Sequence, residues 1–265
     1  MPRSKTRSSS ASTRKTYSAP ALEKGIDIIE LLADAEKGLT VSEISLGLKR
    51  RMSELFRIIV VMERRQWVQK DVDTARYSVT YRVLRLAHRG TPAPMLTLAA
   101  APAMNDLSTR INQSCHLVVR SGHQGLVILR QENQQRHANL SVRLGAVIDL
   151  ATSCSGHVLL AHLDAEERDA VLRSLRRPAG QSRVSLEKAL ARIRKHGYLV
   201  QRSPITAGVT DVSYPIHSFD GKVIAALTVP YLHVLNHSLP TTVEQTQRLL
   251  EQTSRRVSRS LGWDR

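Results

Sequence analysis

The amino-acid sequence predicts an α+β protein that begins with a winged helix-turn-helix domain. Apolar residues recur at helical spacing in three short segments between residues 18 and 65, and the period then changes to two over residues 67–80. Beyond a stretch rich in proline and glycine at residues 90–94, strand-like and helix-like segments alternate to the C-terminus. These patterns predict two domains, the second an α+β domain built on an antiparallel sheet.

The composition indicates a polyanionic partner. The 265 residues include 39 Lys and Arg against 23 Asp and Glu, a net charge of +16, which favours binding to nucleic acid or, less often, to an anionic membrane surface. Aromatic residues make up only 4%, so no strand offers the stacking platform of an RNA-binding protein. No apolar run reaches the roughly 18–20 residues of a membrane span, and Cys115 and Cys154 are too few for a disulfide framework. We therefore expect a cytoplasmic protein with reduced thiols and no membrane partner.

Residues 1–17 are predicted to form a disordered basic arm. Their composition cannot bury a core. Such an arm either solubilises the protein or lies along DNA phosphates, and the two roles are compatible. Its cations, with no acidic residue among them, are Arg3, Lys5, Arg7, Arg14 and Lys15.

Residues 18–80 are predicted to form the winged helix-turn-helix domain. Ser18 can cap the first helix, and Pro20 suits its first turn. Thr40 and Glu43 have the spacing of a capping box, which places the start of a second, short helix at residue 40.

The third helix is predicted to carry a buried stripe that includes Leu55 and Met62, with Ser53 as its cap. Two short strands, Trp67–Lys70 and Arg76–Thr80, follow it. In a winged helix-turn-helix the third helix enters the major groove of DNA with its N-terminus first.

Six residues around the start of the third helix are therefore candidate DNA contacts. Three cations precede the helix, where they can meet phosphates or guanine edges. Three further side chains lie on the exposed side of its first two turns, within reach of base edges. The alternative is that these charges only solvate a surface. The six candidates are Lys49, Arg50, Arg51, Ser53, Glu54 and Arg57.

Residues 81–93 are predicted to form a linker helix and hinge, because Gly90 and Pro92 interrupt a helical pattern. Residues 94–265 form the predicted second domain. Its expected elements are a hairpin around "SGHQG", a strand over 138–145, helices over 155–163, 164–175 and 185–197, strands on either side of the turn "DG" at 220–221, and a terminal helix over 241–263.

The first domain resembles that of the IclR-type bacterial transcription regulators. The stretch from "LEKGIDIIELLADAEKG" to "TYRVLRLA" carries the resemblance, above all in the third helix. Two positions depart from the family pattern, namely Lys49, where proline is common, and Gln66, where glycine is usual. The residues that match the recognition-helix pattern S-x-x-x-R-x-L-x-x-L-E-x-x-G-[YW] are Ser53, Arg57, Ile59, Met62, Glu63 and Trp67.

The resemblance extends over most of residues 18–262. The segments "LATSCSGHVLLAHL", "IRKHGYLVQRSPITAGVTDVSYPI" and "DGKVIAALTVPYL" look like the effector domain of the family. This implies a GAF-like α+β domain that binds a small metabolite, often a carboxylate or an aromatic acid. It also implies a homodimer or a homotetramer. The DNA affinity or activity of such a regulator changes when the metabolite binds.

Six residues fall where members of the family line the effector cavity: Ser153, Cys154, Ser155, Gly156, Asp211 and Thr228. Asp211 departs from the family pattern, in which an apolar or small residue is common at this position. An ionised Asp211 would repel a bare carboxylate, so it either suits a ligand with hydroxyl or amine donors or pairs with an arginine. Ser153 and Ser155 precede a helix and could bind an anion or hydroxyl group. Helix capping is the equally simple alternative for both.

Two other functions remain open at this point. The second domain could serve only for oligomerisation, or the region of Ser155 and His157 could belong to a hydrolytic enzyme. The hydrolase is disfavoured because "SCSGH" lacks the G-x-S-x-G nucleophile elbow. No metal or other cofactor is expected, because the histidines and cysteines lack the C-x-x-C and H-E-x-x-H spacings. The sequence does not distinguish a repressor from an activator.

Overall fold

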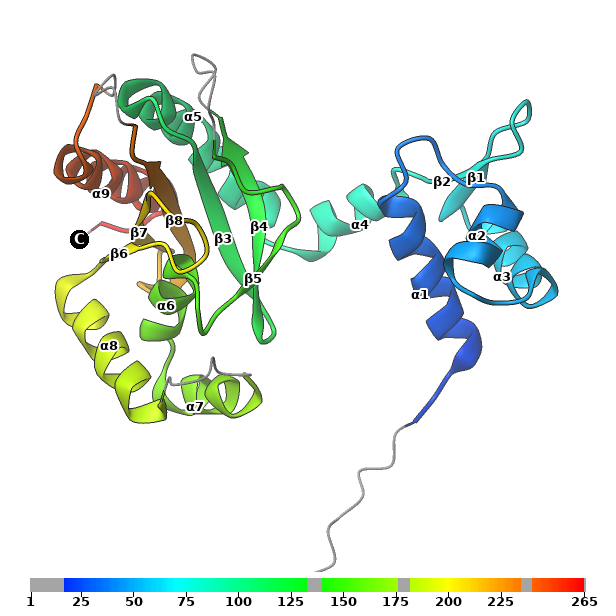
Figure 1. Ribbon diagram of the computed structural model, residues 1–265, viewed down its shortest axis with the longest axis horizontal. Helices are drawn as coiled ribbons and strands as arrows, with labels where there is room; N and C mark the ends of the chain where they lie inside the picture. The colour runs from blue at the N-terminus through cyan, green and yellow to red at the C-terminus, as the bar shows by residue number, and fades with distance from the viewer. Residues whose placement is uncertain (1–16, 133–139, 176–181, 235–239, 265) are drawn as a thin grey trace, which may run out of the picture. The chain divides into compact units, whose positions relative to one another are not determined.

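The computed structural model describes residues 17–132, 140–175, 182–234 and 240–264 (Figure 1). The chain forms two compact units, the first ending at Thr91 and the second beginning at Pro92. Apart from Tyr17, the predicted basic arm lies outside the described residues. Within those residues, no helix has the length and apolar character needed to cross a membrane.

The first unit is a winged helix-turn-helix, as predicted. Its apolar core combines residues from the three helices and the two strands, among them Ile28, Ile44, Leu55 and Ile59, all fully buried. β1 and β2 pair antiparallel as the wing. The elements are α1 (Pro20–Ala33), α2 (Val41–Gly47), α3 (Met52–Arg64), β1 (Val68–Lys70), β2 (Tyr77–Val79) and α4 (Arg82–Gly90).

The predicted caps of the first and third helices are wrong. Ala19 occupies the N-cap position of α1, and Glu23 reaches back to accept the Ala19 N–H at 3.1 Å, so that Ser18 lies outside the helix. α3 starts at Met52, one residue before Ser53, and its N-cap Arg51 makes no side-chain capping bond. Ser53 therefore lies in the first turn of α3.

The second unit is built on a six-stranded sheet in the order β5-β4-β3-β8-β7-β6, with every neighbouring pair antiparallel. Gly197, at the end of the helix predicted over 185–197, ends α8 with a left-handed φ of +81°. The elements are α5 (Ala93–Ile111), β3 (Cys115–Ser121), β4 (Gln124–Gln131), β5 (Val147–Asp149), α6 (Cys154–Ala161), α7 (Ala165–Ser174), α8 (Arg183–His196), β6 (Leu199–Arg202), β7 (Val209–His217), β8 (Val223–Leu232) and α9 (Val243–Ser260).

Helices cover both faces of this sheet. α5 and α9 pack on one face over an aliphatic core that includes Leu117, Val212 and Leu227. α6 packs on the other face against β7 and β8, with α8 beside it, over a second core that includes Val118 and Leu190 (Figure 1). Successive residues of β7 and β8 therefore point alternately toward α9 and toward α6.

The strand predicted over 138–145 is wrong for its described part. A turn replaces it, because Ala146 N–H donates to the Arg143 carbonyl at 3.1 Å and Gly145 has a left-handed φ of +78°. The residues of the turn bond to β4, since Gly145 N–H donates to the Val127 carbonyl and Val127 N–H donates to the Ala146 carbonyl, and the strand β5 itself begins at Val147. Residues 138 and 139 lie outside the described residues.

Candidate DNA-binding and effector sites

The turn between α2 and α3 presents three of the candidate cations. The Ser45 hydroxyl donates to the Arg50 carbonyl at 2.6 Å, and Arg50 N–H donates to the Ser45 carbonyl at 3.1 Å. Lys49 has a φ of +52°, which proline, fixed near about −65°, could not adopt. The turn is thus held against α2 by its backbone, and the side chains of Lys49, Arg50 and Arg51 are exposed.

The first two turns of α3 expose the other three candidates. Leu55 and Ile59 of the same helix are fully buried, whereas Ser53, Glu54 and Arg57 are exposed. The structure therefore places all six predicted residues on accessible surface at the start of α3. This agrees with a helix that reads DNA from its N-terminal end.

Glu54 has a partner that the sequence did not reveal. The Lys24 ammonium of α1 lies 2.8 Å from its carboxylate, and the hydrogen bond and charge of Lys24 lower the pKa of Glu54. The Lys24 ammonium offsets the negative charge of a carboxylate that would otherwise repel phosphates. The Arg50 guanidinium lies 3.9 Å from the Asp27 carboxylate of α1. Most of the remaining positive charge of this surface therefore comes from Lys49, Arg51 and Arg57.

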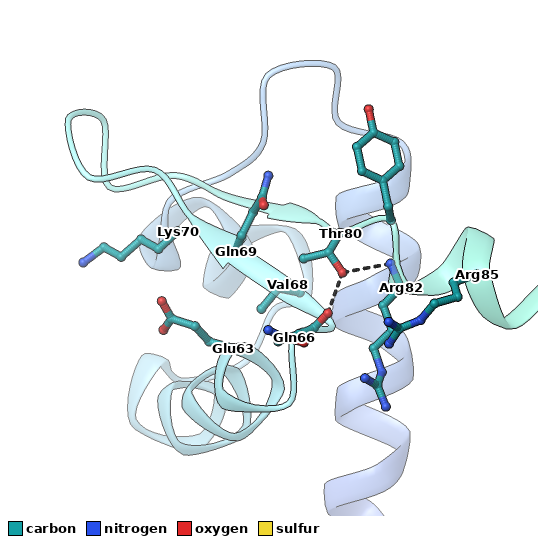
Figure 2. Close-up of a pocket in the computed structure, with 9 residues that line it drawn as sticks. Glu63, Gln66, Val68, Gln69, Lys70, Thr80, Arg82 and Arg85 are labelled. Atoms are coloured by element: carbon teal, nitrogen blue, oxygen red, sulfur yellow. Dashed lines mark hydrogen bonds between the residues drawn. The ribbon is translucent and has the colours of Figure 1, made fainter.

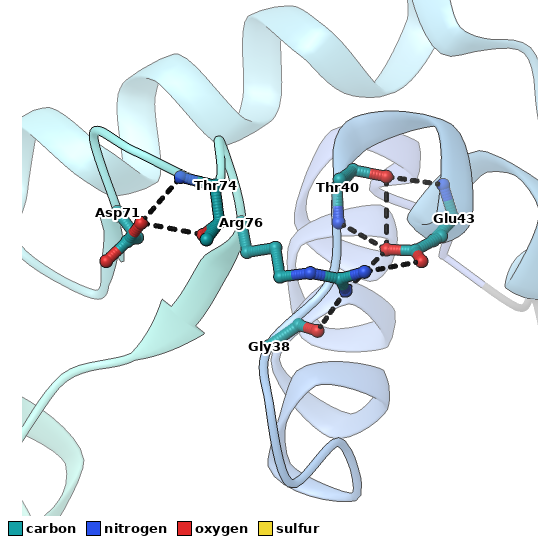
Figure 3. A network of polar contacts seen from close by, with 6 residues as sticks. All are labelled: Gly38, Thr40, Glu43, Asp71, Thr74 and Arg76. Carbon is teal, nitrogen blue, oxygen red and sulfur yellow. Dashed lines mark hydrogen bonds and ion pairs between the residues drawn. The ribbon is translucent and has the colours of Figure 1, made fainter.

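A polar network fixes the wing to the start of α2 (Figure 3). The predicted capping box is present, since Glu43 N–H donates to the Thr40 hydroxyl at 3.3 Å and Thr40 N–H donates to the Glu43 carboxylate at 2.8 Å. Arg76 of the wing donates to both Glu43 oxygens, at 2.8 and 3.0 Å, and to the Gly38 carbonyl at 2.9 Å. The guanidinium thus contacts three oxygen atoms at the α2 end of the domain, and the hydrogen bonds from Thr40 N–H and from Arg76 lower the pKa of Glu43.

A shallow hollow of about 580 Å³ lies beside the wing (Figure 2). Arg82 and Arg85 of α4 line it together with Lys70 of β1 and Glu63 of α3. The Arg82 guanidinium lies 5.5 Å from the centre of the Trp67 ring, a distance typical of a cation–π contact. The basic side of α4 is thus turned toward the wing.

α4 also carries large apolar side chains that are open to solvent. Every residue of the helix is at least partly exposed, including Val83, Leu84 and Leu86. Exposed large aliphatic side chains grouped on a short helix are typical of a surface that another protein covers.

Two residues at the start of α6, Ser153 and Gly156, have structural roles. The Ser153 hydroxyl accepts Gly156 N–H at 3.0 Å and donates to the Asp149 carbonyl at 2.7 Å, so it caps the helix. A Cβ added to Gly156 would lie 2.5 Å from the Leu150 Cα and 2.7 Å from its carbonyl oxygen. Of the two alternatives for Ser153, the capping role is the one observed. Ser155, the next residue in the helix after Cys154, is buried.

The Cys154 thiol of α6 contacts the backbone of Asp211 on β7. Its sulfur lies 3.8 Å from the Asp211 carbonyl oxygen and 3.7 Å from that of Leu199. Burial, with the nearby Asp211, raises the pKa of the Cys154 thiol well above its ordinary value, so the thiol stays protonated. Burial also raises the pKa of Asp211, while a hydrogen bond with Ser203 opposes that rise.

A buried polar row crosses the sheet under α6, and sequence reasoning found only one of its members. Thr228 pairs in register with Ser213 on one side and with His116 on the other. The Ser213 and Thr228 hydroxyl oxygens are 2.8 Å apart. Burial lowers the pKa of His116 to about 4, so its ring is neutral at pH 7. The only sequence signal for His116 and Ser213 is a polar residue within an otherwise apolar strand.

His157 is tied to the backbone. Its Nε2 lies 2.7 Å from the Ala151 carbonyl oxygen and donates to it, and burial lowers the pKa of the ring. The ring therefore stabilises the loop before α6 in this structure.

Comparison with known proteins matches these two units to two domains of one family. Residues 21–72 match the IclR helix-turn-helix domain, and residues 94–259 match the domain described as bacterial transcriptional regulator IclR C-terminal. The chain belongs to the IclR family of bacterial transcriptional regulators. As a member of the IclR family it is a ligand-responsive DNA-binding regulator, as the sequence predicts.

Named relatives support this assignment over nearly the whole chain. The HTH-type transcriptional regulator XynR of Escherichia coli is 25% identical over 250 residues, covering 92% of this chain and 97% of its own length. The HTH-type transcriptional repressor AllR of Klebsiella pneumoniae is 24% identical and covers 92% and 90%. An IclR homologue from Microbacterium hydrocarbonoxydans, solved in complex with 4-hydroxybenzoate, is 26% identical with a TM-score of 0.73, covering 91% of this chain and 98% of its own. These relatives are regulators, and the hydrolase alternative gains no support from them.

Proposed function

We propose that this regulator binds its operator by inserting the start of α3 into the major groove. The observation that carries the proposal is the exposure of Arg57 and Ser53 on the first two turns of α3, with Lys49, Arg50 and Arg51 next to them. In this assignment Arg57 and Ser53 face base edges and the three turn cations face phosphates. Glu54, paired with Lys24, is the remaining candidate contact.

Arg57→Ala is expected to reduce sequence discrimination. Loss of its base contact should cost about 1–3 kcal/mol of specific binding and little non-specific binding. Arg50→Ala should weaken specific and random duplexes alike and make the salt slope shallower by about one phosphate contact. Anisotropy titrations of the full-length protein on its own promoter region and on a random duplex, over a salt series, measure both effects.

Arg173→Ala is the matched control, since it removes one exposed cation from α7 of the second unit. It should change neither discrimination nor the salt slope beyond the effect of net charge. If Arg57→Ala binds both duplexes as the unmodified protein does, α3 does not read the operator.

We further propose that the effector binds between α6 and the sheet. Cys154, Ser155, Asp211 and Thr228 are the predicted residues that remain candidates for contact, because the side chain of Ser153 is engaged in capping and Gly156 is required for packing. To these we add His116, whose neutral ring could accept or donate one hydrogen bond. Burial of Asp211 favours its uncharged form and so reduces its repulsion of a carboxylate.

A small hydroxylated aromatic acid is the effector class that this site fits best. The hydroxyls of Thr228 and Ser213 offer hydrogen bonds to a ligand hydroxyl. The structurally similar IclR homologue with bound 4-hydroxybenzoate supports the same class.

Thermal-shift measurements should show stabilisation by such an acid. A ligand at about 100 times its Kd adds about 2.7 kcal/mol. Ser155→Ala and Thr228→Val should reduce the shift, whereas Thr109→Val on the exposed side of α5 should not. Absence of stabilisation by any hydroxylated or aromatic acid, with Ser155→Ala behaving as the unmodified protein does, contradicts the site and favours a second unit that serves only for oligomerisation.

We also propose that the protein acts in the cytoplasm as a homodimer or a dimer of dimers. The exposed aliphatic side chains of α4, Val83, Leu84 and Leu86, support a second copy as the partner, because helix-turn-helix proteins commonly read two half-sites. The assignment of residues 81–93 to a linker helix and hinge agrees with this role.

A further inference from the structure

The DNA-facing side of α3 carries a row of exposed apolar side chains beside its polar contacts. Met52, Phe56 and Val60 are spaced by four residues, and 46%, 51% and 43% of their surfaces are exposed. Side chains three or four residues apart are neighbours on a helix, so Phe56 lies next to Ser53 and Val60 lies next to Arg57. The apolar row thus adjoins the residues assigned to base edges.

The charge around this row selects its partner. Arg50, Arg51, Arg57 and Arg64 are exposed close by, and Glu54 is neutralised by Lys24. An apolar protein surface would have to desolvate these cations, whereas a nucleic acid pairs with them. The occupant that fits both the cations and the apolar row is duplex DNA.

Only one apolar group is offered by base edges in the major groove, namely the C5-methyl group of thymine. We infer that Phe56 and Val60 contact thymine methyl groups next to the base read by Arg57, so that the operator carries thymine at those positions. This inference rests on the proposed entry of α3 into the major groove. It adds a second, apolar source of specificity to the polar one.

Removal of thymine methyl groups tests the inference without altering the protein. The probe is a duplex selected from a random-sequence pool by the full-length protein, and each thymine is replaced in turn by deoxyuridine. Each contacted methyl should contribute about fourfold in affinity, since burial of one such group is worth about 0.8 kcal/mol. Phe56→Ala should bind the thymine duplex about tenfold more weakly and should lose the preference for thymine over uracil at the contacted position.

Ile26→Ala is the control, because Ile26 on α1 is exposed to a similar extent, at 47%. It should retain the thymine preference of the unmodified protein. The inference is wrong if the unmodified protein ignores every deoxyuridine replacement, or if Phe56→Ala keeps the full preference. In either case, a loss of discrimination in Arg57→Ala would show that α3 still reads the operator. Unchanged binding in Arg57→Ala as well would instead overturn the proposed function.

Discussion

Gly156→Ala is expected to lower the free energy of unfolding of the second unit by about 3 kcal/mol. The added methyl group would meet the Cα and carbonyl oxygen of Leu150 at 2.5 and 2.7 Å, and backbone atoms cannot rotate away as a flexible side chain can. Overpacking of this kind typically costs about 1–3 kcal/mol, and a backbone clash lies at the upper end of that range. The start of α6 would have to move away from the loop that precedes it.

Urea unfolding followed by Trp263 fluorescence measures this effect. The chain has two tryptophans, so a Trp67→Phe background leaves only Trp263, which stacks on His217 with ring centres 4.4 Å apart in the second unit. Gly90→Ala is the matched change, because no atom lies within 4 Å of its added Cβ. It should leave this transition unchanged. Equal urea midpoints for Gly156→Ala and the Trp67→Phe parent would show that the loop before α6 moves without loss of stability.

Acidification is expected to destabilise the same unit through His116. The pKa of its ring is lowered from 6.5 to about 4 by burial. Between these two values the unfolded chain holds a proton that the folded chain lacks, so the free energy of unfolding falls as the pH falls from 6.5 to 4. The full effect of a shift of this size is about 3 kcal/mol. It is absent above pH 6.5.

The measurement is urea unfolding between about pH 7.5 and 4.5, compared for the parent and for His116→Gln, which removes the titrating ring. The variant should show a shallower pH dependence, whatever its stability at neutral pH. Burial also lowers the pKa values of His157 and His162, so part of the slope should persist. His123→Gln, in the exposed turn between β3 and β4, is the control for the loss of a histidine outside the core. A His116→Gln slope equal to that of the parent would contradict a buried, neutral His116.

The elements that could be predicted from the sequence are those that local patterns specify. Thr40 and Glu43 are three residues apart, and the capping box they predict is present. The buried spacing of Leu55 and Met62 likewise gives the correct inner face of α3. Periodicity and short-range capping act within one or two helical turns, so a single sequence reveals them.

The contacts that were missed join residues distant in the chain. Arg76 and Glu43 are 33 residues apart, and their ion pair depends on how the wing returns to α2. His116 meets Thr228 only because β3 pairs with β8, a pairing that nothing local in either strand specifies. Ser53 was wrongly predicted as a cap because its residue type suits that position, whereas Arg51, two residues earlier, occupies the N-cap.

Gln66 is a departure from the family pattern, and its backbone conformation explains why glycine is usual at this position. Its φ of +60° lies in the left-handed region, where glycine has no steric penalty and other residues do. The preference for glycine at this position therefore reflects backbone geometry between α3 and the wing. Here the backbone keeps that geometry with glutamine in place.

The hydrogen bonds of Arg76 limit the ways in which metabolite binding can change the affinity for the operator. The Arg76 guanidinium joins the wing to α2, because it donates hydrogen bonds to the Glu43 carboxylate and to the Gly38 carbonyl. A movement of the wing relative to α2 inside one DNA-binding domain would break these hydrogen bonds. In the proposed dimer, a change in the distance between two intact DNA-binding domains would leave these bonds in place and would cost less free energy.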